Sequence, residues 1–206
     1  MVKITWLRHA SVLLEGTKRV LIDPWEVNET QTADLVLITH DHYDHLSLPD
    51  LKAVCGPATE IVVPEGAKSK LGGVKGKVHA VRPGQELNAA GLRVEVVAAY
   101  NVSKSFHPKT SGNVGYVVSL DGQRIYHAGD TDRIPEMKGL TPDVALLPVG
   151  GTYTMDAAEA AKAVADLQAK KAIPMHYGTI VGDRKDAEQL KKLCPVPVEI
   201  LEPAVK

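Results

Sequence analysis

The stretch from Leu35 to His45 constrains this chain more than any other part of its sequence. It begins with four apolar residues which, together with Thr39, have the length and β-branched content of a buried strand. The next six positions hold three His and two Asp, namely His40, Asp41, His42, Asp44 and His45. Imidazole and carboxylate groups suit Zn²⁺ and similar divalent ions. Because a strand ends rigidly and holds the following side chains in place, the pattern predicts metal binding.

The spacing within this loop predicts two adjacent metal sites. His40 and His42 stand two residues apart, so in an extended turn both can point toward one ion. Asp44 and His45 follow where the chain turns, and they can face a second ion. The alternative is a solvated polar loop after a core strand, although such loops favour Gly, Ser and Asn over clustered imidazoles.

The pattern His40-x-His42-x-Asp44-His45 resembles the signature loop of the metallo-β-lactamase superfamily of metal-dependent hydrolases. Other parts of the family's pattern occur in the same order between Asp23 and His176. Gly129-Asp130-Thr131 matches the form common in small lactonase-like and uncharacterised members. The resemblance implies an α/β fold, specifically a four-layer αβ/βα sandwich of two packed sheets with helices outside. Periodicity alone supports only a mixture of α and β.

Carried over residue by residue, the resemblance implies seven metal ligands in two sets that share one member. They are His40, His42 and a third His for one ion, Asp44, His45 and His176 for the other, and Asp130 between the two. A carboxylate has two oxygens and can bridge two cations, which suits Asp130. Asp44 would also orient the nucleophile, so Asp44 and Asp130 are the expected catalytic residues.

The third His departs from the family's pattern. It is expected directly after the strand that ends at Ala99, where this sequence has Tyr100-Asn101. Neutral Asn adds little affinity for a borderline-soft ion. His107 lies six residues later in a loop stiffened by Pro108, and it could fold back to the required position. We predict that His107 completes the first site; the alternative is a depleted site with His107 facing solvent.

Four further residues are candidates for supporting roles. Asp23 ends a strand, and by resemblance it accepts a hydrogen bond from the free N–H of a ligand and so fixes its orientation. A simple turn cap is the alternative for Asp23. His9 is either a support of the same kind or a packed side chain. Tyr153 and Tyr177 follow strands that lead to the same edge, where either could donate a hydrogen bond to substrate.

Alternation and turn residues place the secondary structure along the whole chain. Strands are predicted at 2–7, 11–15, 19–23, 35–39, 60–64, 77–82, 85–88, 92–99, 114–120, 123–127, 143–149, 171–175 and 198–201, and helices at 48–54, 156–169 and 183–193. His79 and His127 fall inside strands and are expected to be structural. The chain shows no linker or low-complexity segment, so we expect one domain over residues 1–206.

Composition narrows the classes of partner. The 24 basic and 25 acidic residues give a net charge of −1, which argues against a nucleic-acid footprint or a polybasic membrane face. The first residues lack the apolar core of a signal peptide, and no apolar run reaches transmembrane length. We therefore expect a cytoplasmic protein that acts on a small molecule. In that compartment Cys55 and Cys194 are expected to be free thiols.

The implied chemistry is hydrolysis. Two divalent ions about 3.5–4 Å apart can hold a water between them and lower its pKa to about 7, which supplies hydroxide at neutral pH. We expect Zn²⁺, with Mn²⁺, Ni²⁺ or Fe²⁺ as alternatives, and a small ester, lactone or phosphodiester as substrate. The resemblance also narrows the class. His42 in place of a carboxylate disfavours the di-iron redox branch of the superfamily, and Asp130 stands where the resemblance places Cys in true β-lactamases, so antibiotic hydrolysis is not expected. The alternative function is a non-catalytic metal-binding or sensing module on the same fold.

Overall fold

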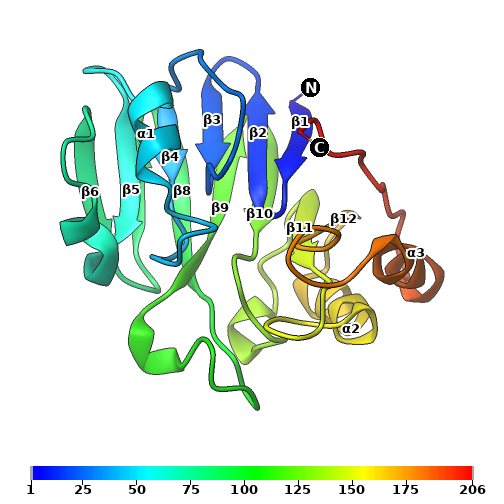
Figure 1. The fold of residues 1–206 in the computed structure, drawn as a ribbon. Coiled ribbons are helices and arrows are strands. Elements are labelled where there is room, and N and C mark those ends of the chain that lie inside the picture. The colour runs from blue at the N-terminus through cyan, green and yellow to red at the C-terminus, as the bar shows by residue number, and fades with distance from the viewer. Residues whose placement is uncertain (1, 206) are drawn as a thin grey trace.

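Two six-stranded mixed sheets form the framework of the computed structural model, which describes residues 2–205 (Figure 1). The first sheet contains β1 (Lys3–Arg8), β2 (Ser11–Glu15), β3 (Arg19–Ile22), β4 (Leu35–Leu37), β5 (Glu60–Pro64) and β6 (Lys77–Val81) in that order. The second contains β12 (Lys171–Met175), β11 (Val144–Pro148), β10 (Gln123–His127), β9 (Val114–Leu120), β8 (Leu92–Ala98) and β7 (Glu86–Ala89). The helices are α1 (Leu48–Val54), α2 (Ala157–Leu167) and α3 (Arg184–Leu193), with short 3₁₀ turns η1 (Glu65–Lys70), η2 (Lys109–Ser111) and η3 (Pro135–Met137).

Each sheet begins as an antiparallel meander and ends with parallel strands. In the first sheet β1, β2 and β3 pair antiparallel and β3 to β6 pair parallel. In the second sheet β7 to β10 pair antiparallel and β10 to β12 pair parallel. Because parallel strands end at the same edge, the loops after β3, β4, β10, β11 and β12 can meet there. In Figure 1 these loops lie along the lower edge of both sheets.

Alternation along the strands divides the apolar residues between two layers. Leu13, Leu21 and Val36 point away from the second sheet and pack against α1, through Leu51 and Val54. Their strand neighbours, such as Leu14 and Leu37, belong to the larger core shared with the second sheet, whose far side α2 and α3 cover. The order helix, sheet, sheet, helix confirms the predicted four-layer α/β sandwich.

Several predicted strands and helices match the observed bounds, and nearly all the others differ by only one or two residues at one or both ends. The strand predicted at 35–39 ends earlier, at Leu37, because the N–H of Thr39 donates to the Asp23 carboxylate instead of a neighbouring strand. The free thiols are confirmed within the described chain: Cys55 is buried and Cys194 partly exposed. None of the helices between residues 2 and 205 has the length and apolar character that a membrane span requires.

The predicted terminal strand at 198–201 is wrong. This segment makes only an isolated bridge between Val198 and Ala172 of β12. Prolines nearby have no N–H for a ladder, which limits the pairing. Farther on, the N–H groups of Ala204 and Val205 donate to the carbonyls of Trp6 and Leu7, each at 2.9 Å. The C-terminal segment therefore lies against β12 and β1, one edge strand of each sheet.

Candidate metal centre

Asp23 fixes the start of the loop that follows β4. Its fully buried carboxylate accepts hydrogen bonds from the Thr39 N–H at 2.7 Å and from the Thr39 hydroxyl at 2.6 Å. The same carboxylate lies 2.8 Å from Nδ1 of His45, and the Thr39 hydroxyl lies 3.0 Å from Nδ1 of His40. Both imidazoles can thus donate from Nδ1, which leaves each Nε2 lone pair for the centre of the site. The predicted supporting role of Asp23 matches this arrangement.

The first ligand set joins His40, His42 and His107. Nδ1 of His42 lies 3.0 Å from Nε2 of His40 and 3.3 Å from Nε2 of His107. The candidate ligand atoms of all three lie within 4.8 Å of one another, close enough to hold one ion. His107 is only 2% exposed, so the alternative in which it faces solvent is wrong.

The second set contains His9 together with Asp44, His45 and His176, again with ligand atoms within 4.8 Å. Nε2 of His9 lies 3.1 Å from Oδ2 of Asp44, and the His9 ring packs at 3.8 Å from the His176 ring. The carbonyl of His9 accepts the N–H of His176 at 2.8 Å, which ties β1 to the end of β12. His9 is thus part of the centre. His9 lies in a tight turn with φ 48°, a backbone conformation that few residues other than Gly adopt.

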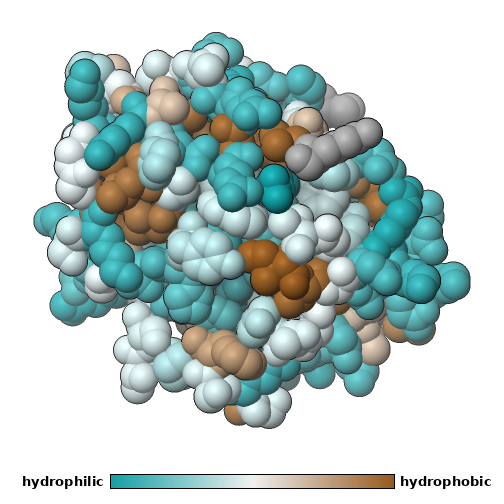
Figure 2. All heavy atoms as spheres, in the orientation of Figure 1, coloured by the Kyte–Doolittle hydropathy of each residue, from teal (hydrophilic) through white to brown (hydrophobic). Residues whose placement is uncertain are grey.

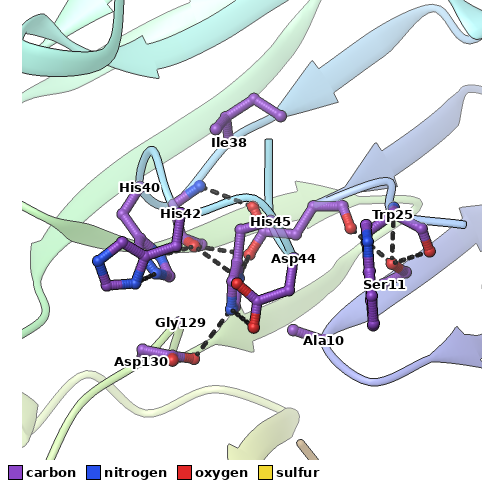
Figure 3. Close-up of polar contacts among 12 residues, drawn as sticks. Ala10, Ser11, Trp25, Ile38, His40, His42, Asp44, His45, Gly129 and Asp130 are labelled. Atoms are coloured by element: carbon purple, nitrogen blue, oxygen red, sulfur yellow. Dashed lines mark hydrogen bonds and ion pairs between the residues drawn. The ribbon is translucent and has the colours of Figure 1, made fainter. Parts of the chain in front are cut away.

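Asp130 lies between the two sets. Its carboxylate oxygens are 3.0 Å from Nε2 of His176, 3.4 Å from Nε2 of His45 and 3.5 Å from Nε2 of His107. Figure 3 shows Asp130 facing the His40–His45 loop from the opposite sheet. Gly129 makes this approach possible, because its φ is 63° and an added Cβ would lie 2.7 Å from the carbonyl oxygen of Val114.

Buried atoms without partners indicate that this centre suits a cation. Nε2 of His45 and Nε2 of His176 lie near the Asp130 carboxylate, but these contacts lack the geometry of hydrogen bonds. Both nitrogens, and Oδ1 of Asp130, are therefore buried without a hydrogen bond from residues 2–205. Leaving such atoms unpaired costs free energy, so each needs a further partner. Imidazole nitrogen and carboxylate oxygen are ligands that Zn²⁺ and similar divalent ions bind, so such an ion fits the centre.

The electrostatics of the site also favour metal binding. Although burial opposes ionisation, His176 and His45 hold the pKa of Asp130 well below its usual range. Burial lowers the pKa of His40 and His107, so both are neutral at pH 7. Burial alone would lower the pKa of His45, but the Asp130 and Asp23 carboxylates raise it well above normal. A cation at Nε2 of His45 would therefore displace a proton.

Asn101, at the position where the family's third His is expected, supports His107. Its side-chain oxygen accepts the His107 N–H at 2.9 Å and lies 3.3 Å from Nδ1 of the His107 ring. Its amide nitrogen donates to Asp132 at 3.0 Å and to the carbonyl of Tyr153 at 2.9 Å. Asn101 therefore orients the imidazole while His107 reaches the centre.

We expect His107→Ala to lower the occupancy of one ion and to spare the set built on Asp44, His45 and His176. The change removes one of the three imidazoles of the first set without touching the second. Asn101→Ala should have a smaller effect, about 10-fold to 100-fold in the affinity of the same ion. Titration with Zn²⁺ against a competing chelator measures both. Two sites with wild-type affinity in His107→Ala would contradict this assignment.

The two histidines predicted to be structural, and the two tyrosines predicted to contact substrate, lie at different distances from the centre. His127 is buried and lies 2.9 Å from the carbonyl of Ala10, and His79 pairs with Glu60, so both lie apart from the two ligand sets. Tyr153 lines the cavity beside the centre. Tyr177 does not; its ring packs on Trp6 at a centroid distance of 4.8 Å.

Comparisons with known proteins agree with this geometry. The profile of the Beta-lactamase superfamily domain matches residues 3–176, a range that includes every residue of the centre. A UPF0173 metal-dependent hydrolase of Thermococcus onnurineus is 36% identical, with 98% of this chain and 96% of that protein covered.

Two solved structures extend the comparison. A protein from Parabacteroides distasonis, proposed to be a metal-dependent hydrolase, has a TM-score of 0.86 and 36% identity, with 98% of this chain and 93% of that one covered. The metallo hydrolase Igni18 from Ignicoccus hospitalis has a TM-score of 0.79 and 28% identity, with 98% of this chain and 95% of that one covered.

Proposed function

This chain belongs to the beta-lactamase superfamily and to the UPF0173 metal-dependent hydrolases, and from this premise we infer that it cleaves a small ester, lactone or phosphodiester with two divalent ions. The observation that carries the proposal is the pair of ligand sets that converge on Asp130. We propose His40, His42 and His107 for one ion, Asp44, His45 and His176 for the other, and Asp130 for both. Zn²⁺ suits these ligands, with Mn²⁺, Ni²⁺ or Fe²⁺ as alternatives.

Bound divalent ions would supply a water activated at neutral pH and would polarise the substrate. The protein's own groups position that chemistry. The pKa of Asp44 lies below its usual value. Burial opposes this shift, but the hydrogen bond from His9 and the charges of His45 and His9 together outweigh it, so Asp44 is ionised and can accept a proton of the attacking water. Burial lowers the pKa of His9 to about 4, which makes it a neutral donor to Asp44 at pH 7.

We expect Zn²⁺-reconstituted protein to hydrolyse at least one of p-nitrophenyl acetate, γ-butyrolactone and bis(p-nitrophenyl) phosphate. Removal of the ions with a chelator should abolish turnover, and Zn²⁺ should restore it. His79→Ala is the matched control, because His79 lies outside both ligand sets; it should keep two ions per chain and full activity. Two bound ions without turnover of any substrate would favour the metal-binding or sensing module instead.

A further inference from the structure

A cavity of about 250 Å³ opens onto the candidate metal centre, with Asp44, Asp130 and His176 in its wall. Another part of the same wall is apolar or aromatic, and we call these four side chains the collar: Tyr43, Phe106, Tyr153 and Ile180. They come from four separate loops, which follow β4, β8, β11 and β12. The cavity therefore joins reactive groups at its base to a hydrophobic rim.

Three of the four collar side chains are exposed to solvent, although large hydrophobic side chains are mostly buried in this protein. Tyr43 is 68% exposed, Phe106 is 48% exposed and Ile180 is 36% exposed. Within residues 2–205 only two other large hydrophobic side chains, Val102 and Leu193, are exposed to a similar extent. Figure 2 shows the apolar surface on one face of the molecule as separate small patches. Three such side chains around one opening indicate a binding surface.

Two aromatic contacts hold the collar in place before any ligand binds. Phe106 meets Tyr153 edge to face at a centroid distance of 4.7 Å. Tyr43 meets Trp25 edge to face at 5.9 Å. Such pairs restrict the rings, so less conformational entropy is lost when an apolar group enters.

The charge of the cavity wall distinguishes an anionic substrate from a neutral one. Among the described residues that line this cavity there is no Lys or Arg. Cations in the neighbouring loops are already paired, since Lys104 lies 2.6 Å from Asp132 and Arg8 lies 3.2 Å from Glu26. A phosphodiester carries a negative charge and gains from Arg or Lys around its oxygens. The collar offers phenyl and aliphatic surface instead, which suits an uncharged apolar group.

We propose, on the basis of the hydrolase function above, that the substrate is a neutral carboxylic ester or lactone whose apolar substituent lies in the collar. The oxygen of water forms a bond to the acyl carbon and the bond from that carbon to the alkoxy oxygen breaks. The alkoxy oxygen takes one proton of the water, and the other is released when the product acid ionises. At about 30 Å³ per water-sized group, the cavity has room for roughly eight such groups, which must include the ester itself as well as its apolar substituent.

The test compares p-nitrophenyl acetate, butyrate and hexanoate with the Zn²⁺-reconstituted full chain. Full burial of one methylene raises affinity about fourfold, and burial in the half-open collar about twofold. Hexanoate has four more methylenes than acetate, so kcat/KM should rise roughly 10-fold between the two substrates. Comparing γ-decalactone with γ-butyrolactone measures the same chain-length preference on a cyclic ester. Turnover of these lactones relative to the p-nitrophenyl esters then distinguishes a cyclic from an open substrate. Calorimetry with octanohydroxamic and acetohydroxamic acid measures the same preference without turnover, and the longer acid should bind at least 10-fold more tightly.

Variants locate the preference on the collar. Phe106→Ser and Ile180→Ser should each reduce the hexanoate-to-acetate ratio to about threefold or less. Val102→Ser is the control in the Phe106 loop, because Val102 is 66% exposed and lies outside the cavity wall; its ratio should match the wild-type protein.

Four outcomes contradict the proposal. A flat dependence on chain length, or equal binding of the two hydroxamic acids, would overturn it and leave the hydrolase function intact. The same holds if bis(p-nitrophenyl) phosphate is hydrolysed with a higher kcat/KM than the hexanoate. Loss of all turnover in a protein that holds two ions would overturn the hydrolase function and this inference together.

Discussion

Asp130→Ala is expected to reduce kcat/KM by about 10³-fold or more and to lower the affinity for both ions. Loss of a residue that merely supports one ligand costs about 10-fold to 100-fold in affinity, and Asp130 faces both ligand sets directly. Its carboxylate lies within 3.5 Å of His45, His107 and His176. Steady-state kinetics and metal analysis on the same preparation measure the two effects.

Tyr153→Phe is the matched comparison for Asp130→Ala, because Tyr153 lines the same cavity but can contribute only one hydrogen bond. Its loss should cost at most about 10-fold. Thermal unfolding of the metal-free proteins shows that each variant is folded. A Tyr153→Phe protein with both ions and no activity would move the chemistry from Asp130 to that hydroxyl.

Asp23→Ala is expected to lower the free energy of unfolding by about 3–5 kcal/mol. The change leaves two buried donors on Thr39 and Nδ1 of His45 without an acceptor, at about 1–3 kcal/mol each. It also places Ala at φ 45°, which is unfavourable for that residue. A loss of this size is a large share of a typical domain's stability. Chemical denaturation of the metal-free protein measures it.

Asp23→Asn separates stability from metal binding. The amide oxygen still accepts the Thr39 N–H, and Asn tolerates a positive φ. Its NH₂ group would donate to Nδ1 of His45, which favours the tautomer that carries a proton on Nε2. We expect most of the stability to remain while Zn²⁺ affinity falls by about 10-fold to 100-fold. Wild-type Zn²⁺ affinity in Asp23→Asn would contradict the role given to this carboxylate.

The parts of the centre that follow strands could be predicted from the sequence. His40, Asp130 and His176 each come after a buried strand, and parallel strands end at one edge, so their convergence follows from the pattern. Asp23 could be placed for the same reason. His107 required a chemical argument, because Asn is a weak ligand and the loop is long enough to return.

The remaining features depend on contacts between distant segments. The role of His9 depends on β1 lying beside the end of β12, a pairing across the two sheets that no local pattern encodes. Asn101 orients His107 through a hydrogen bond within an irregular loop. The predicted terminal strand has suitable residues, but beside β12 it forms only the isolated bridge between Val198 and Ala172. The collar also draws on four loops whose meeting depends on the whole fold.

Anomalous diffraction from a crystal of the Zn²⁺-reconstituted protein tests the two-ion centre most directly. We expect two zinc peaks per chain on either side of the Asp130 carboxylate, one against His40, His42 and His107 and the other against Asp44, His45 and His176. A single peak, or two peaks with Asp130 bound to neither, would contradict the proposed centre.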